Sequence, residues 1–342
     1  MRYDDVWIAG TGAYAGERFP VATAVTQGRV EEHLAEGVGA VSVAQSNLAP
    51  PEMAVIAGRE AVGTAARTGT VASTDTTFIH SYTNFQGIEF WPTECWLAGQ
   101  LLGEKLTTLP TSICAGSNGS LACLSAAADL LKAHADVPSV LITAADRFPA
   151  PWDRWHLSPG MFFGDGAAAA VLTRGNGKYK LDSLATRTDT ALEGLARGAE
   201  NFAISSPLEK PNSARRTREF LSQQRMSLRQ VRSRSADGVR EVTYQALSEA
   251  GVTIEQIDWC ITPFVGKTLH EQGFMEPLGN PRAGSLQRLG LTLGHLGPAD
   301  GLYALDHLLK QGMCHTGHKV VVIGTGMGFT FGAAVFTVSA NQ

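Results

Sequence analysis

The sequence predicts an α/β fold in which two similar halves pack together as one rigid body. Three observations predict it. Buried strands alternate with helices, one helix-and-strand pattern recurs 178 residues later, and no Pro- or Ser-rich linker divides the 342 residues. We expect the halves to span residues 1–175 and 176–342.

Short apolar runs bounded by turn residues predict buried strands. These runs are residues 6–9, 77–79, 139–142, 168–172, 259–261 and 319–323. Ala- and Leu-rich segments with apolar residues three and four positions apart predict helices at 52–66, 119–135, 239–250 and 298–311. Because these helices lie between the strands, we expect largely buried sheets.

The repeat is the most informative pattern in the chain. Adding 178 to the numbers of residues 117–132 gives 295–310, and similar residues coincide, including Gly119 with Gly297 and Leu124 with Leu302. A second pair of segments, 52–80 and 239–263, agrees, since each contains a helix, a glycine, an aspartate and a strand. The alignment predicts that Ser117 and His295 occupy equivalent positions, just before two helices that a pseudo-twofold axis brings together.

These positions suggest a nucleophile and its base. A helix amino terminus offers unpaired N–H groups that stabilise a developing oxyanion, so Ser117 is a candidate nucleophile and His295 its base. Pro298 suits the first helical position, which places Asp300 where its carboxylate can reach back and orient the imidazole. Simpler interpretations remain open: Ser117 as a helix cap, Asp300 as a complement to the helix dipole, and His295 as a core or loop histidine.

Composition excludes several classes of function. Twenty-eight basic and 32 acidic residues leave no basic field for nucleic acid, and no apolar stretch is long enough to cross a membrane. The first residues lack a signal pattern, so we expect a cytoplasmic protein. Five cysteines without paired spacing predict neither a disulfide framework nor a Cys-rich zinc site. The nearest approach to a metal-ligand spacing is Cys314 with His315 and His318, and we do not expect it to bind a metal.

Three further segments need an interpretation. Residues 10–15 fit a dinucleotide-binding pattern, but no helix-forming run follows, so we do not expect a nucleotide site. Residues 324–329 predict a glycine-rich loop that approaches substrate closely. The stretch 186–235 is locally basic and predicts either a solvated face or a docking surface for a phosphate-bearing partner. Its cations are Lys210, Arg215, Arg216, Arg218, Arg225, Arg229, Arg232 and Arg234.

Four segments resemble the β-ketoacyl-acyl-carrier-protein synthase III branch of the thiolase superfamily. They are residues 8–14, 117–124, 163–172 and 326–332, so the resemblance covers essentially the whole chain. It implies a duplicated five-layer αβαβα fold, a homodimer, and acyl-CoA as a substrate with no permanently bound cofactor. It also implies that the acyl group is carried on the nucleophile, with the backbone N–H groups of Ser117 and Met327 forming the oxyanion hole.

The departures from the family pattern are equally informative. The family cysteine is replaced by Ser117. A frame three residues earlier would make Cys114 the nucleophile, but it places Pro110 inside a strand and breaks the repeat, so we favour Ser117. The family's histidine and asparagine, which stabilise the enolate formed on decarboxylation, are replaced by Phe264 and His295.

Loss of those two donors weakens the case for decarboxylative condensation as the reaction. The Ser-His-Asp set favours plain acyl transfer instead. The pattern is similar to a divergent subgroup from polyketide antibiotic pathways. We therefore predict an acyltransferase that moves an acyl group from acyl-CoA or an acyl carrier protein, through Ser117, to a hydroxyl or thiol acceptor. We expect Phe264, Phe163 and Arg154 to contact substrate. The alternatives are a starter-unit ketosynthase and a non-catalytic partner subunit.

Overall fold

The computed structural model describes residues 1–149, 152–204, 212–223 and 226–339. The described residues form a nine-stranded sheet in the order β5-β4-β6-β7-β1-β8-β11-β10-β9. A small second sheet pairs β2 (Glu17–Pro20) with β3 (Ser42–Gln45). The strands of the large sheet are β1 (Trp7–Ala15), β4 (Thr77–Ser81), β5 (Thr111–Ser112), β6 (Ser139–Asp146), β7 (Gly166–Thr173), β8 (Tyr179–Thr188), β9 (Trp259–Ile261), β10 (Lys319–Gly326) and β11 (Thr330–Val338).

The strand order repeats across the large sheet. The run β4-β6-β7-β1 has the same order and the same directions as β9-β10-β11-β8, with one parallel pair followed by antiparallel pairs. The two runs join through a short antiparallel contact, in which Trp7 pairs with Lys180 and Ile8 with Tyr179. The predicted boundary at 175/176 falls in the loop between β7 and β8; as a division into domains it stays a prediction.

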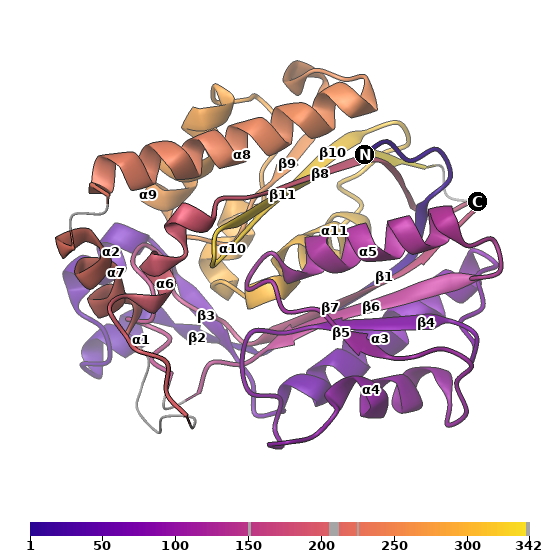
Figure 1. The fold of residues 1–342 in the computed structure, drawn as a ribbon, viewed down its shortest axis with the longest axis horizontal. Helices are drawn as coiled ribbons and strands as arrows, with labels where there is room; N and C mark the ends of the chain where they lie inside the picture. Colours follow the sequence, from indigo (N-terminus) through magenta and orange to yellow (C-terminus); the bar gives the residue numbers. More distant parts are fainter. Residues whose placement is uncertain (150–151, 205–211, 224–225, 340–342) are drawn as a thin grey trace.

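The helices form three layers around the two half-sheets, as Figure 1 shows. α5 (Gly119–Ala133) and α11 (Asp300–Lys310) lie between the half-sheets and share one core with both. α3 (Pro50–Arg67) and α4 (Thr93–Leu102) cover the outer face of the first half-sheet, and α8 (Leu228–Ala250) covers that of the second. Successive strand residues alternate between the cores, as the period of a strand requires. The predicted five-layer αβαβα fold is therefore confirmed.

The first glycine-rich segment is part of a strand rather than a loop. β1 continues from Trp7 through Ala15, beyond the predicted end at residue 9. A Cβ at Gly10 would lie 2.3 Å from the Ala61 carbonyl oxygen, and one at Gly12 would lie 2.1 Å from that of Ala57. These glycines are therefore required because α3 packs directly on the strand backbone.

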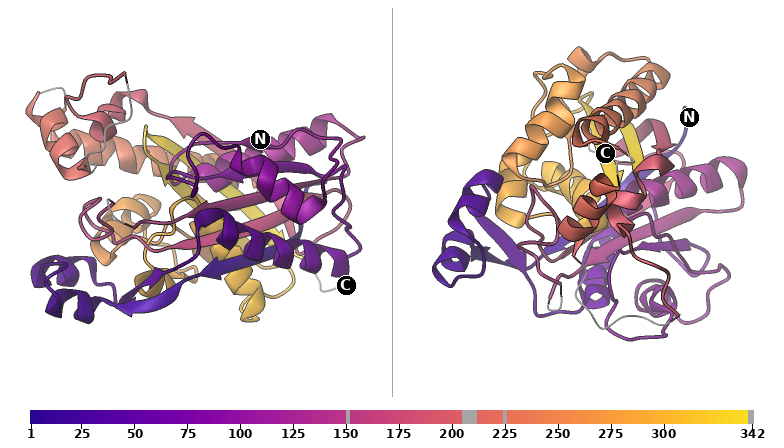
Figure 2. Two further views of the ribbon diagram at one scale, coloured as in Figure 1. Left: turned by 90° about the horizontal axis from the view of Figure 1, so that it is seen from below. Right: turned by 60° about the vertical axis from the view of Figure 1, so that its left-hand side comes forward.

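Short elements gather at one end of the molecule. Figure 2 shows that α1 (Val21–Thr26) and α2 (Glu32–Val38) project at the same end of the sheet as α6 (Gly194–Arg197) and α7 (Ser213–Ser222). Two further short α-helices of the described chain are α9 (Lys267–His270) and α10 (Gln287–Leu293). None of the helices in the described part of the chain is long and apolar enough to cross a membrane.

Candidate active site

Ser117 lies in the turn that leads into the middle-layer helix α5. The Asn118 N–H donates to the Ala115 carbonyl at 3.2 Å, and the Gly119 N–H donates to that of Gly116 at 3.0 Å. These bonds form the turn, and α5 begins at Gly119. Ser117 is thus next to a helix amino terminus, as the sequence predicts, with its side chain partly buried.

His295 occupies the matching place before α11. Gly294 and Gly297 flank it with φ angles of +72° and +63°, which L side chains rarely adopt, so the glycines permit two sharp turns around the histidine. The backbone also pairs with the loop before β7: the His295 N–H donates to the Phe162 carbonyl at 2.8 Å, and the Gly164 N–H donates to that of His295 at 3.0 Å. The main chain at His295 is therefore held between two glycine turns and by hydrogen bonds to a distant segment.

Asp300 is the first residue of α11, two positions after Pro298 in the preceding 3₁₀ turn Gly297–Ala299. Its carboxylate reaches back as predicted. Oδ1 accepts the Leu296 N–H at 2.8 Å, while Oδ2 accepts the Phe264 N–H at 2.8 Å and contacts Nδ1 of His295 at 2.5 Å. Asp300 and His295 are only 5% and 3% exposed, so the pair is shielded from water.

The structure brings the three predicted residues together. Ser117 Oγ lies 2.6 Å from Nε2 of His295, whose other ring nitrogen faces Asp300. Because the ionised carboxylate only accepts hydrogen bonds, Nδ1 carries the hydrogen, and Nε2 of the neutral imidazole accepts from the Ser117 hydroxyl. This arrangement activates a serine hydroxyl for attack on a carbonyl.

The turn that carries Met327 adjoins Ser117. It connects β10 to β11, whose end residues Gly326 and Thr330 pair across the hairpin. A Cβ at Gly116 would lie 3.0 Å from the Met327 backbone nitrogen, so this amide is beside the segment that immediately precedes Ser117. The Met327 side chain itself is 54% exposed. The place of the turn is compatible with the predicted oxyanion role of the Ser117 and Met327 amides, which stays a prediction.

Cys114 is exposed, and within the described residues the hydrogen-bond partners of the His295 ring are Ser117 and Asp300. The Cys114 thiol is hydrogen bonded to Tyr82, and partial burial, together with the Asp146 carboxylate, raises the pKa of the thiol. A raised pKa reduces the fraction of thiolate, which is the nucleophilic form. The geometry therefore favours Ser117 over Cys114.

The three predicted substrate-contacting residues differ in their surroundings. The Phe163 ring packs edge-on against the His295 imidazole at a centroid distance of 5.3 Å, so it forms a wall of the site. Phe264 is 2% exposed and packs against Tyr303, and it meets the site through its backbone N–H to Asp300.

Arg154 is occupied by structural bonds. Its guanidinium donates to both oxygens of Asp165 at 3.1 Å and to the carbonyls of Ala44 and Phe163. The side chain therefore fastens the loop that carries Phe163, and sequence reasoning missed this role. Contact of Arg154 or Phe264 with substrate stays a prediction.

Asp146 is a buried acid near the site that the sequence did not single out. It is 0% exposed at the end of β6, and it accepts the backbone N–H groups of Thr83 and Asn84. A Cβ at Gly297 would lie 2.5 Å from its Oδ2, which places the acid directly beneath the turn after His295. Burial raises the pKa of Asp146 to about 6. In the sequence, the position of Asp146 at the end of the apolar run 139–145 is the signal that could have identified it as a buried acid near the site.

A cavity of about 660 Å³ lies away from these residues. It is lined by Thr11, Asp306 and His315 among others, toward the carboxyl end of α11, and it contains none of the predicted site residues. Within the described ranges, no three His, Cys, Asp or Glu side chains are grouped to hold a metal ion. His315 and His318, the nearest metal-like pair in the sequence, stack edge-on at 5.0 Å.

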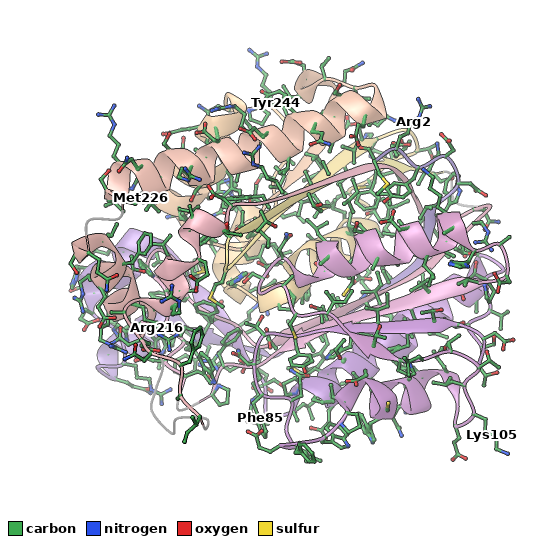
Figure 3. The ribbon with its side chains drawn as sticks, in the orientation of Figure 1. Arg2, Phe85, Lys105, Arg216, Met226 and Tyr244 are labelled. Carbon is green, nitrogen blue, oxygen red and sulfur yellow. The ribbon has the colours of Figure 1, made fainter. Side chains whose placement is uncertain are left out.

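The basic segment falls largely on α7 and the first turns of α8. Figure 3 shows Arg216 and Met226 on the side of the molecule where α6 and α7 lie. Arg215 and Arg216 pair with Glu200, and Arg234 pairs with Asp189. Three other cations of this segment, Arg218, Arg229 and Arg232, are exposed and form no ion pair within the described part of the chain. Lys210 and Arg225 lie outside the described residues.

Comparison with known families agrees with this architecture. The family model "3-Oxoacyl-[acyl-carrier-protein (ACP)] synthase III" matches residues 112–190, and its C-terminal counterpart matches residues 247–338. The first includes Ser117, and the second includes His295, Asp300 and Met327. The chain belongs to the β-ketoacyl-acyl-carrier-protein synthase III family, within the thiolase superfamily.

Curated relatives with this family's name match part of the chain. The β-ketoacyl-[acyl-carrier-protein] synthase III of Thermosynechococcus vestitus is 29% identical over 232 residues, which is 65% of this chain and 65% of the relative. That of Clostridium novyi is 25% identical over 250 residues, or 71% of this chain and 72% of the relative. The chain thus covers slightly less than two thirds of the first relative's length.

Solved structures match over nearly the full length. ChlB3, described as an acyltransferase, has a TM-score of 0.87 and 31% identity, and the alignment covers 98% of both chains. The synthase III of Pseudomonas aeruginosa has a TM-score of 0.76 and 17% identity, covering 99% of this chain and 100% of that one. At that identity the second likeness supports the fold alone.

Proposed function

We propose that this protein is an acyltransferase of secondary, polyketide antibiotic metabolism. It takes an acyl group from acyl-CoA or an acyl carrier protein and passes it, through Ser117, to a hydroxyl or thiol acceptor. The observation that carries the proposal is the Ser117–His295–Asp300 arrangement, with distances of 2.6 and 2.5 Å. The 31% identity with ChlB3, an acyltransferase, supports acyl transfer as the reaction.

In the first half-reaction, Nε2 of His295 takes the proton of the Ser117 hydroxyl as Oγ attacks the thioester carbonyl carbon. The carbonyl oxygen becomes an oxyanion, to which the Ser117 and Met327 amides donate. The carbon–sulfur bond then breaks, and the leaving thiolate takes the proton from His295. The result is an acyl ester on Ser117 and a free thiol.

In the second half-reaction, the same base activates the acceptor. His295 removes the proton of the acceptor hydroxyl or thiol, which attacks the ester carbonyl of acylated Ser117. The bond between the acyl carbon and Oγ breaks, and Oγ recovers the proton from His295. Asp300 stabilises the imidazolium in both halves, because its Oδ2 faces Nδ1.

A starter-unit ketosynthase is the second candidate, and the names of the matched family models favour it. In that reaction the acyl-enzyme would condense with a malonyl unit and release carbon dioxide. Release of ¹⁴CO₂ from malonyl-labelled carrier protein, at the rate of acyl consumption, would select the ketosynthase over the acyltransferase.

Intact mass spectrometry tests the proposal. Wild-type protein incubated with a panel of acyl-CoA esters should gain one acyl mass, and the adduct should be lost in Ser117→Ala. An adduct that survives this substitution would refute the assignment of the nucleophile. Failure of the wild type with every thioester would favour the non-catalytic partner subunit. The homodimer and the cytoplasmic location remain predictions.

A further inference from the structure

Asn118, the residue after the proposed nucleophile, does not cap the helix that it precedes. Asparagine is a preferred capping residue, yet Asn118 has φ −87° and ψ 7°, and its side chain makes no capping bond to α5. Its Nδ2 instead donates to Thr330 Oγ1 at 3.3 Å, across the interface to β11. The side chain is 4% exposed.

Three glycines leave room for this side chain. A Cβ at Gly324 would lie 2.4 Å from Oδ1 of Asn118, one at Gly326 would lie 3.0 Å from its Cβ, and one at Gly332 would lie 3.1 Å from Oδ1. All three belong to the β10–β11 hairpin, in which Gly324 pairs with Gly332. The hairpin backbone thus closes around the Asn118 amide from two strands.

The same hairpin carries the Met327 turn. Thr330, which accepts from Asn118, pairs with Gly326, and these two residues bound the turn on either side. The Asn118 side chain therefore connects the start of α5, next to Ser117, to the base of the turn that holds the Met327 amide.

The fit depends on shape as well as on hydrogen bonding. Within the described ranges Oδ1 of Asn118 has no hydrogen-bond donor, although the atom is fully buried. Buried acceptors without a donor are uncommon and call for an explanation. The space around Oδ1 is narrow enough that a Cβ at Gly324 or Gly332 would collide with it, so we infer that the amide is retained as a spacer between α5 and the hairpin.

We propose that Asn118 is a positioning residue that sets the distance between Ser117 and the Met327 amide, and thereby the width of the oxyanion hole. This inference rests on the oxyanion role proposed above. Asn118 touches no reacting atom. A small error in the placement of an oxyanion donor slows catalysis strongly, since the donor must meet charge that develops only in the transition state.

The test uses an activated ester, p-nitrophenyl acetate, so that it does not depend on recognition of CoA. In Asn118→Ala, the rate of Ser117 acylation, followed by p-nitrophenolate release and by mass, should fall roughly 10- to 100-fold with little change in KM. The pH profile should keep its shape, because His295 and Asp300 are untouched. Ser120→Ala, a similarly buried position on α5 at 5% exposure, is the matched control and should remain near wild-type rate.

A second variant acts from the hairpin. Gly332→Ala places a methyl group against Oδ1 and should also slow acylation. Combined with Asn118→Ala, that methyl group occupies part of the space vacated by the amide, so the double variant should lose roughly threefold less than the product of the single effects. This rescue would not arise from general destabilisation of either element.

The inference is overturned if Asn118→Ala acylates within about twofold of wild type, if Ser120→Ala is equally slow, or if the double variant is strictly multiplicative. Wild type that reacts with the ester at Ser117 but with no thioester would refute the proposed function alone, and the variant comparison would still decide this inference. Wild type that is never acylated at Ser117 would refute both.

Discussion

Ser117 and His295 are separated by 178 residues, and Oγ of the first lies 2.6 Å from Nε2 of the second. Each precedes a helix of the middle layer, α5 or α11, and each helix leads into a strand at the corresponding place in its half-sheet, β6 or β10. The site is therefore assembled from both half-sheets, and neither half contains both a nucleophile and its base.

Replacement of Ser117 should abolish acylation, whereas replacement of Cys114 should not. Ser117→Ala removes the hydroxyl that lies 2.6 Å from Nε2 of His295, and we expect a loss of roughly 10³-fold or more in the rate of acyl transfer. Cys114→Ala should retain a rate close to wild type, because the thiol contacts Tyr82 instead. Loss of the adduct in Cys114→Ala with retention in Ser117→Ala would reverse the assignment.

Asp300→Asn should impair catalysis and stability together. The carboxylate of Asp300 accepts hydrogen bonds from three groups: the backbone N–H groups of Leu296 and Phe264, and Nδ1 of His295. The asparagine side chain has only one acceptor oxygen. We expect kcat to fall by about 10³- to 10⁴-fold, as in other triads, and unfolding free energy to fall by about 1–3 kcal/mol. Steady-state kinetics and urea denaturation measure the two effects. A variant with normal kcat would show that Asp300 has a structural role only.

Asp146 should make stability depend on pH. Burial raises its pKa from 3.8 to about 6, so between these values the folded protein holds a proton that the unfolded chain has released. Stability from this group is therefore full below about pH 4 and is lost as pH rises through 6, by on the order of 3 kcal/mol.

The non-ionisable variant Asp146→Asn isolates this effect. Its unfolding free energy relative to wild type should increase between pH 4 and pH 7, even if its absolute stability is lower because the Thr83 and Asn84 amides lose a charged acceptor. Urea denaturation at a series of pH values gives the difference. Parallel curves for the two proteins would contradict the prediction.

Charge reversal on α8 should weaken the use of carrier-protein substrates selectively. Arg229 and Arg232 are exposed near the start of α8 without an ion pair among the described residues, so they are available to a phosphate-bearing partner. Arg229→Glu with Arg232→Glu should raise the apparent KM for acyl-carrier substrates roughly 10-fold and leave that for acyl-CoA unchanged. Arg240→Glu, further along the helix, is the control. Equal effects on both substrate classes would argue against a docking surface.

Gly12→Ala should destabilise the fold without changing the chemistry. A Cβ there would lie 2.1 Å from the Ala57 carbonyl oxygen, so α3 must move away from β1. We expect a loss of about 2–3 kcal/mol in unfolding free energy, with an unaltered kcat for the molecules that remain folded. Gly63→Ala on α3, where a Cβ would meet no atom within 4 Å, is the matched control and should be neutral or stabilising.

Much of this fold and site follows from local patterns. Strand β9 begins and ends where its apolar run does, and the repeat by itself predicts that Ser117 lies opposite His295. β8 was missed although Tyr179 and Leu181 alternate with Lys180 and Asp182, which is the period of a strand with one buried face. Reading that alternation would have found it.

Other features depend on tertiary contacts that no local pattern encodes. The sequence does not show that Arg154 pairs with Asp165, which lies eleven residues further along the chain and meets the guanidinium only in the folded structure. Asp146 is buried at the end of β6, and Gly297 from the other half lies directly against its carboxylate. Asn118 resembles an ordinary helix cap until the glycines of the β10–β11 hairpin are placed around it.

The repeated strand order has a chemical consequence. If two identical copies of one half formed a symmetric dimer, the residue that precedes the middle-layer helix would be the same in both copies. One copy could not then provide a serine while the other provided a histidine. Fusion in one chain removes that restriction. The position equivalent to Asp300 is Ala122, so the counterpart helix has no acid to orient a base. A variant with histidine at position 117 and serine at position 295 would therefore lack an oriented base and should not form the acyl-enzyme. The two halves share one fold, but only the second half can supply the base.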